Sequence, residues 1–218
     1  MTKSKKPRWQ RRKDERPAEI VSAALEVFTA RGFAATRLDD VARRAGISKG
    51  TLYLYFRSKE ELFKAVVRET LVPNIALAEA QFADQATPTP ELLTRVLRRM
   101  AGVIASPIGA IPKLVIAEAG NFPDLARFYI EEVVGRGMGL VGRLLARGMA
   151  RGEFRAINPA STGPIVVGPM MLLAMWKHAL EPHAPPQARA AFELNSFFET
   201  YSDVLLRGLL AKPAGAGD

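Results

Sequence analysis

The stretch from Ala45 to Phe56 constrains the fold of this chain more than any other part of the sequence. Gly46 provides the backbone freedom for a tight turn, and Ser48 is a good N-cap for the helix that follows it. In that helix Leu52 and Phe56 are four residues apart, so both side chains point inward. The stretch therefore predicts the turn and second helix of a helix-turn-helix.

The same short helix directs polar side chains outward. Lys49, Thr51, Tyr53 and Tyr55 would present a cation, a hydroxyl and two phenols to solvent. These groups suit the base edges and phosphates of a nucleic-acid groove. For Tyr53 the alternative is a half-buried packing position, which is common for tyrosine.

Net charge is concentrated in the part of the chain that holds this motif. Residues 1–64 contain 16 Lys and Arg against 8 Asp and Glu, whereas residues 65–218 contain 15 against 14. Nearly all of the formal charge of +9 therefore lies beside the predicted helix-turn-helix. A basic excess on one module is typical of a DNA-binding protein.

The sequence contains few of the residues and motifs that are typical of enzyme active sites. It contains no cysteine and only two histidines, His178 and His183. Disulfides and thiolate chemistry are thereby excluded, and we find no nucleophile elbow, Gly-rich phosphate loop or metal-ligand cluster. We expect no enzymatic activity, no cofactor and no metal. The lack of cysteine and of a signal peptide fits a cytoplasmic location.

One uncharged stretch, residues 156–176, raises the question of a membrane span. Only residues 164–176 are continuously apolar, which is short of the roughly 20 residues that a spanning helix needs. Pro159, Pro164 and Pro169 also interrupt the stretch. We expect a buried or interface helix and no membrane partner.

The rest of the pattern predicts an all-α fold with a small N-terminal bundle and a larger C-terminal one. Gly32 should close the first helix, and Ser58 with Glu61 forms a capping box at the start of the fourth. Pro73 should end or kink that fourth helix, because proline lacks an N–H and clashes with the preceding turn. Further helices are expected at 91–105, 111–119, 124–151, 163–180 and 187–211.

Residues 28–62 resemble a known family. The pattern Phe28-x3-Gly32-Phe33, Thr36, Val41-Ala42-x3-Gly46-Ile47-Ser48-Lys49-Gly50-Thr51-Leu52-Tyr53-Leu54-Tyr55-Phe56-x2-Lys59-Glu60-x-Leu62 is similar to the N-terminal domain of the TetR family of bacterial transcriptional regulators. A softer resemblance covers residues 117–126. The resemblance to this family implies a three-helix helix-turn-helix DNA-binding domain joined to a larger C-terminal helical bundle for ligand binding and dimerisation.

The resemblance implies a homodimeric, ligand-responsive repressor of a near-palindromic double-stranded DNA operator. The last two helices would form the dimer, and a small hydrophobic or aromatic effector would release the DNA. A nonspecific architectural DNA-binding protein and a lipid- or drug-binding module are the alternatives. The expected boundaries are a basic flexible arm at 1–16, a helix-turn-helix domain at 17–64, an effector-binding and dimerisation domain at 65–211 and a tail at 212–218.

The family's DNA contacts carry over where the motif matches. Lys49 to Thr51 would lie in the first turn of the recognition helix, and Tyr53, Tyr55 and Lys59 match phosphate contacts. Arg37 departs from the family's Thr or Ser, so Thr36 is expected to cap the second helix and Arg37 to contact phosphate. The basic arm either contacts DNA or stays solvated. The predicted DNA-binding set is Thr36, Arg37, Ser48, Lys49, Gly50, Thr51, Tyr53, Leu54, Tyr55 and Lys59.

Candidates for an effector pocket are apolar side chains of the C-terminal half. Methionine and aromatic walls adapt to hydrophobic ligands, and His178 or Glu118 would be a polar anchor. For each residue a place in the ordinary core is the alternative. The predicted set is Ile104, Ile116, Phe122, Phe128, Met138, Val141, Met171, Met175, Trp176 and His178, with Met100 and Leu145 as further candidates.

Overall fold

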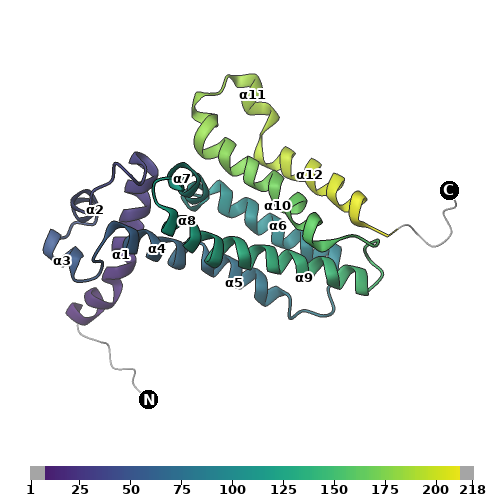
Figure 1. The fold of residues 1–218 in the computed structure, drawn as a ribbon, viewed down its shortest axis with the longest axis horizontal. Helices are drawn as coiled ribbons and strands as arrows, with labels where there is room; N and C mark the ends of the chain where they lie inside the picture. Colours follow the sequence, from purple (N-terminus) through teal and green to yellow (C-terminus); the bar gives the residue numbers. More distant parts are fainter. Residues whose placement is uncertain (1–7, 212–218) are drawn as a thin grey trace, which may run out of the picture.

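The computed structural model describes residues 8–211, with side chains from Arg16 onward. Every regular element in that range is a helix, and the one β-type contact is an isolated antiparallel bridge between Phe154 and Leu210, so the all-α prediction is confirmed. A small helical head lies beside an elongated bundle (Figure 1). Residues 1–7 of the expected arm and the expected tail at 212–218 lie outside the described residues.

The head and its connection to the bundle contain four helices. Gly32 ends the first of them with a φ of 81°, and Gly46 turns the chain between the second and third with a φ of 65°. Both values are in the left-handed region that favours glycine, as the sequence predicted. The helices are α1 (Arg8–Arg31), α2 (Leu38–Arg44), α3 (Lys49–Tyr53) and α4 (Lys59–Thr70).

Side-chain caps start the third and fourth helices. The Ser48 hydroxyl accepts a hydrogen bond from the Thr51 amide at 3.1 Å, and the Ser58 hydroxyl accepts one from the Glu61 amide at 3.1 Å. Each cap satisfies a backbone donor that the first helical turn leaves unpaired. The predicted caps at Ser48 and Ser58 are therefore confirmed, but the capping box is not closed, because the Glu61 carboxylate accepts from the Arg57 amide at 2.8 Å and not from Ser58.

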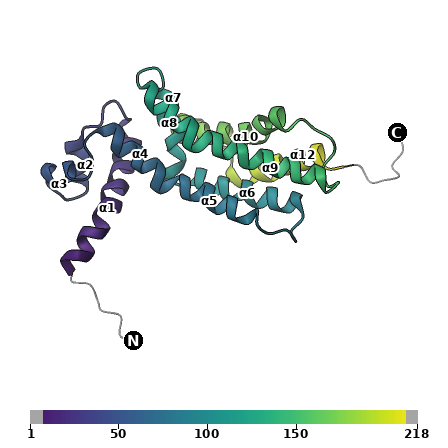
Figure 2. The same ribbon diagram turned by 60° about the horizontal axis from the view of Figure 1, so that its bottom comes forward.

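The flexible arm expected at 1–16 is wrong for residues 8–16, because α1 already begins at Arg8. Gln, Lys, Arg and Glu are good helix formers, so a polar, basic composition by itself did not indicate disorder. In Figure 2 α1 runs from the head away from the bundle, at a steep angle to the bundle's long axis.

The bundle differs from the predicted helices mainly at their breaks. The segment expected at 124–151 is interrupted by a π-helical stretch, Ile130–Gly135, and the last expected helix is broken at Phe192 and Glu193. Glu193 caps the second piece by accepting hydrogen bonds from the Asn195 and Ser196 amides. The helices are α5 (Val72–Gln81), α6 (Thr89–Ala105), α7 (Ile111–Glu118), α8 (Pro123–Tyr129), α9 (Arg136–Ala150), α10 (Pro159–Met175), α11 (Pro186–Ala191) and α12 (Leu194–Leu209).

The break that Pro73 predicted separates α4 from α5. Pro73 lies in the first turn of α5, where its missing N–H removes no helical hydrogen bond. A helix that starts in the head therefore continues into the bundle after one joint.

Two hydrophobic cores are present, and the first crosses from the head into the bundle. The rings of Phe28, Phe33 and Phe63 pack with centroids 5.4 to 5.5 Å apart, and Phe122 of the bundle lies 4.9 Å from Phe33. The second core is built from α6, α9, α10 and α12 around Leu144.

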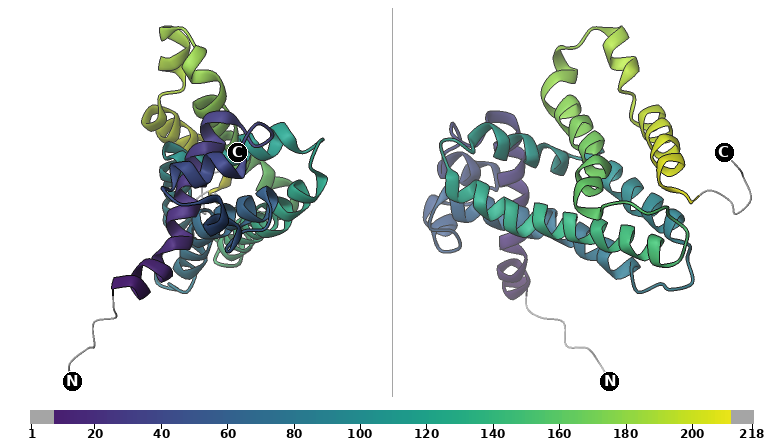
Figure 3. Two further views of the ribbon diagram at one scale, coloured as in Figure 1. Left: turned by 90° about the vertical axis from the view of Figure 1, so that its left-hand side faces the viewer. Right: turned by 45° about the vertical axis from the view of Figure 1, so that its right-hand side comes forward.

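The far side of the bundle carries α10 and α12 side by side, joined over α11 (Figure 3). Within residues 8–211 one helical run, Pro159–His183, is long and apolar enough to cross a membrane, judged by length and composition. Only 28% of its apolar window is buried inside the chain. Much of this apolar helix is therefore open to solvent in the single chain.

Gly148 on α9 packs directly against the ring of Phe154, in the segment between α9 and α10. A Cβ atom placed on it would lie 2.1 Å from Cδ2 of Phe154, whose ring is buried. We expect Gly148→Ala to lower the free energy of unfolding by about 1 to 3 kcal/mol, because the ring has no room to move. Urea unfolding followed by circular dichroism measures the change.

Gly142 is the matched control in the same helix, since no atom lies within 4 Å of its virtual Cβ. Gly142→Ala should raise stability by about 0.5 to 1 kcal/mol through helix propensity. Equal effects of the two substitutions would contradict the proposed contact.

Candidate nucleic-acid interface and ligand cavity

α3 lies at the end of the head, away from the bundle (Figure 2). Lys49, Gly50, Tyr53 and Leu54 are exposed there, and Leu54 is 83% exposed. Leu52 of the same helix is fully buried, which holds the outward set in place. The structure thus brings the centre of the predicted DNA-binding set together on one surface.

Two of these side chains make contacts within the head. The Lys49 ammonium lies 2.9 Å from an Asp39 carboxylate oxygen, and this hydrogen bond raises the pKa of Lys49. The Thr51 hydroxyl is 2.8 Å from the Ser48 hydroxyl. Lys49 therefore stays charged at neutral pH, and a phosphate would compete with Asp39 for it.

Thr36 does not belong to this surface, and its predicted role as the cap of the second helix is wrong. Its side chain is buried, and its hydroxyl donates a hydrogen bond to the Gly32 carbonyl at 2.7 Å. The N-cap of α2 is Arg37, whose amide donates to the Asp40 carboxylate. The Arg37 side chain is exposed and remains a predicted phosphate contact.

Lys59 and Tyr55, also in the predicted set, are half-buried. The Lys59 ammonium donates to the Ala34 carbonyl at 2.9 Å and lies 4.6 Å from the centre of the Phe33 ring. It ties the start of α4 to the turn after α1. A phosphate contact by Lys59 stays a prediction, beside this structural role.

Residues of the bundle also form hydrogen bonds at the turn after α1. The Ala34 amide donates to the Glu118 carboxylate at 3.0 Å, and the Asn121 side chain donates to its other oxygen. Glu118 is therefore part of the contact between head and bundle, not a polar anchor of a cavity. The sequence offered no signal for this pairing, because Ala34 and Glu118 are 84 residues apart.

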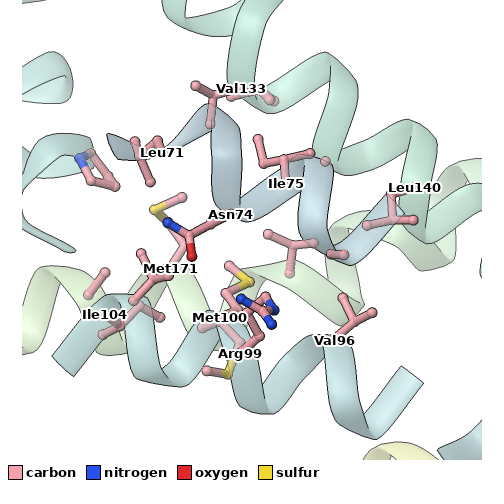
Figure 4. Close-up of a pocket in the computed structure, with 18 of the residues that line it drawn as sticks. Leu71, Asn74, Ile75, Val96, Arg99, Met100, Ile104, Val133, Leu140 and Met171 are labelled. Atoms are coloured by element: carbon pink, nitrogen blue, oxygen red, sulfur yellow. The ribbon is translucent and has the colours of Figure 1, made fainter. Parts of the chain in front are cut away.

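The bundle encloses an apolar cavity of about 200 Å³. This is larger than an engineered apolar cavity of about 150 Å³ that binds benzene, so a small apolar ligand fits. Figure 4 shows its walls, with Met100 and Met171 among aliphatic side chains. Of the predicted pocket residues, the cavity is lined by Ile104, Met138, Val141 and Met171, together with Met100.

The structure places the other predicted pocket residues away from this cavity. Ile116 is 60% exposed, Phe122 and Phe128 belong to the core shared with the head, and Leu145 is buried in the second core. Met175 packs against the second core. Their spacing in the sequence predicts that they lie on apolar helix faces. It does not predict which of these faces borders the cavity.

Trp176 and His178 lie on the π-helical segment after α10 and are likewise not in the cavity wall. Trp176 stacks on Phe192 with ring centroids 4.2 Å apart. His178 Nε2 hydrogen-bonds the Ile104 carbonyl at 2.8 Å. Both side chains have packing roles here.

Three polar lining residues escaped the sequence analysis: Asn74, Arg99 and Tyr129. Burial raises the pKa of the Tyr129 phenol, so it stays protonated. Nε of Arg99 is buried and has no hydrogen-bond partner. Arg95, Arg98 and Arg99 have the i, i+3, i+4 spacing of one helix face, which is the signal that could have identified them.

The Thr36 assignment is testable. We expect Thr36→Val to lower the free energy of unfolding by about 1 kcal/mol, because the Gly32 carbonyl loses its hydrogen bond. The salt dependence of DNA binding should not change, since the side chain does not reach the surface. Chemical unfolding and fluorescence anisotropy at several salt concentrations measure the two quantities. Arg37→Ala, which should lower the salt slope, is the comparison.

Comparison with known proteins agrees with this arrangement. Residues 20–66 match the family described as bacterial regulatory proteins, tetR family, and residues 91–193 match the family described as tetracyclin repressor-like, C-terminal domain. The HTH-type transcriptional regulator YfiR of Bacillus subtilis is 32% identical over 155 residues, which cover 69% of this chain and 73% of that protein.

A second curated relative is the fatty acid metabolism regulator protein of Bacillus subtilis, which is 25% identical over 66% of this chain and 74% of its own length. Among solved structures, the transcriptional regulator FadR of Bacillus subtilis in complex with stearoyl-CoA has a TM-score of 0.72. It is 19% identical and covers 88% of this chain and 98% of its own. At that identity the likeness concerns the fold.

Proposed function

The chain belongs to the TetR family of bacterial regulatory proteins, and we propose that it is a homodimeric repressor that a small apolar effector releases from its operator. Membership makes it a DNA-binding transcriptional regulator of the helix-turn-helix type, and not an enzyme, as the sequence predicted. Repression, the dimer, the operator and the effector are the proposed part. Its proposed location is the cytoplasm.

The single observation that carries the DNA-binding part is the exposed outer face of α3. Lys49, Gly50 and Thr51 occupy its first turn, the part that enters the major groove in helix-turn-helix proteins. The exposed Leu54 offers an apolar contact to a thymine methyl group. We assign residues 17–64 to DNA binding and residues 65–211 to effector binding and dimerisation, although α4 and the first core cross that boundary.

The proposed dimer uses the apolar stripes of α10 and α12. Ile165 and Leu172 are 66% and 51% exposed and lie seven residues apart on α10, and Val204 on α12 is 66% exposed. Residues three, four and seven apart share a helix face, so Ile165 and Leu172 lie on one face of α10. On α12 Val204 shares a face with the half-buried Phe197 and Tyr201. Two copies of this helix pair would bury both stripes in a four-helix bundle.

The proposed effector site is the cavity between α5, α6, α9 and α10. The cavity adjoins the joint between α4 and α5, where Asn74 donates its side-chain amide to the Thr70 carbonyl. A ligand that moves this joint would tilt α4 and change the spacing of the two heads. Coupling of about 1 to 3 kcal/mol is enough for a useful response.

Selection of sheared genomic DNA by the purified protein, followed by sequencing, tests the function. We expect enrichment of one near-palindromic site. Broad retention without a motif, with a steep salt dependence, would instead support the architectural alternative. The operator then allows repression and release by a ligand to be measured in a reporter strain.

Thr51 is the residue that we expect to read a base. Thr51→Ala should reduce the discrimination between the selected operator and its point mutants by about 1 to 3 kcal/mol. Lys49→Met should weaken binding to all sequences alike and lower the salt slope by about one unit. Anisotropy titrations against both DNA sets separate these effects, and the reverse pattern would show that the roles are wrongly assigned.

If the proposed dimer is correct, a charge introduced on the apolar face of α12 should change the oligomeric state. Val204→Arg should convert the protein to a monomer, because it puts a charge on the apolar face that the proposed dimer would bury. Asn195→Arg adds the same charge on another face of α12, where residue 195 is exposed, and should leave the dimer intact. Sedimentation velocity measures the mass, and a wild-type monomer would refute the proposed interface.

A further inference from the structure

Arg99 is the one charged side chain in the wall of the apolar cavity. Its Nε is buried and lacks a hydrogen-bond partner, and no carboxylate of residues 16–211 forms a salt bridge with it. Figure 4 shows Arg99 near Met100 among the apolar side chains of the wall, with Asn74 projecting from another helix. The Arg99 side chain as a whole is half-buried, but its Nε–H is shielded from water without an acceptor from the described residues. An unpaired buried donor is unfavourable, so an acceptor group on a ligand would stabilise it.

The cavity continues into an open groove that is basic. Asn74, Arg99 and Val103 line both spaces, and the groove adds Arg95 and Arg98. Arg95 forms a salt bridge with Glu91 at 2.6 Å, whereas Arg98 lies over the Phe198 ring at 5.8 Å. Gln81 Oε1, also in the groove wall, is buried without a partner. Apolar space therefore leads directly to guanidinium groups and an unpaired amide oxygen.

We propose that the ligand of this site is an amphipathic anion, with an aliphatic chain in the cavity and an anionic group on Arg99. This inference rests on the proposed effector site and specifies its chemistry. A planar guanidinium forms paired, charge-assisted hydrogen bonds with a carboxylate or phosphate, and it forms none with a hydrocarbon. An uncharged aromatic ligand could stack on the guanidinium, but it would offer no acceptor for the buried Nε–H of Arg99.

Two sources supply such a molecule: a free fatty acid and an acyl thioester of coenzyme A. A fatty acid would place its carboxylate on Arg99. A thioester would pass its phosphates outward along the groove, toward Arg95 and Arg98. The shared chemistry is the aliphatic chain next to negative charge, and the two sources differ in which arginines they need.

Isothermal titration calorimetry of the full chain tests the proposal with dodecanoate, dodecanoyl-coenzyme A, coenzyme A alone and the uncharged dodecanol. We expect at least one of the two acyl anions to bind about tenfold or more tightly than dodecanol, since hydrogen bonds to charged groups are strong. Coenzyme A alone should bind weakly, because it leaves the cavity empty.

Arg99→Gln should remove most of the preference for the anion and leave the affinity for dodecanol unchanged. Arg127→Gln is the matched control, because Arg127 is exposed on α8 and pairs with Asp124 outside the cavity. If Arg95→Gln and Arg98→Gln weaken only the thioester, the source is an acyl-coenzyme A. If dodecanoate is the tighter ligand and these two substitutions leave its affinity unchanged, the source is the fatty acid.

Equal affinity for dodecanoate, the thioester and dodecanol, a preference that survives Arg99→Gln, or no binding of any probe would each overturn the proposal. Operator affinity is measured separately in the presence of the tighter ligand. Binding that depends on Arg99 without any change in operator affinity would uphold the anion site and refute the effector role.

Discussion

The packing of Phe33 is the contact on which the rest of the structure depends. Its ring lies against Phe28 and Phe63 of the head and against Phe122 of the bundle, and all four belong to one hydrophobic core. Aromatic pairs of this geometry add about 0.5 to 1.5 kcal/mol each beyond their buried area. The DNA-binding head is therefore packed against the bundle through a shared core, and this packing sets its orientation.

Polar contacts around the same turn make that orientation specific. The Ala34 amide is held by Glu118 and its carbonyl by Lys59, so one residue links α4, α7 and the end of α1. Asn74, in the first turn of α5, lines the cavity and donates its side-chain amide to the carbonyl of Thr70, the last residue of α4. Events in the cavity and the position of α3 are thus separated by a single helix and one joint, which is a short physical route for a ligand response.

The exposed stripes of α10 and α12 explain a feature that otherwise resembles a membrane span. Pro159–His183 is apolar enough for one, yet its inner face already packs in the second core through Val166, Met170 and Leu173. Its own chain buries 28% of the apolar window, and the outward face is left to solvent in the single chain. In the proposed dimer, a second copy of the same helix pair would provide the matching apolar surface.

The sequence by itself determined the local features, and the tertiary structure decided the contacts between distant segments. Gly32, Gly46, Ser48 and Pro73 were predictable because each acts on its own backbone within about one turn. Arg37 at the cap of α2, the Glu118 contact and the unpaired Arg99 were not, because burial and distant partners decide them. A helical pattern shows which side chains are apolar, but only the packing of several helices shows which of them surround an empty space.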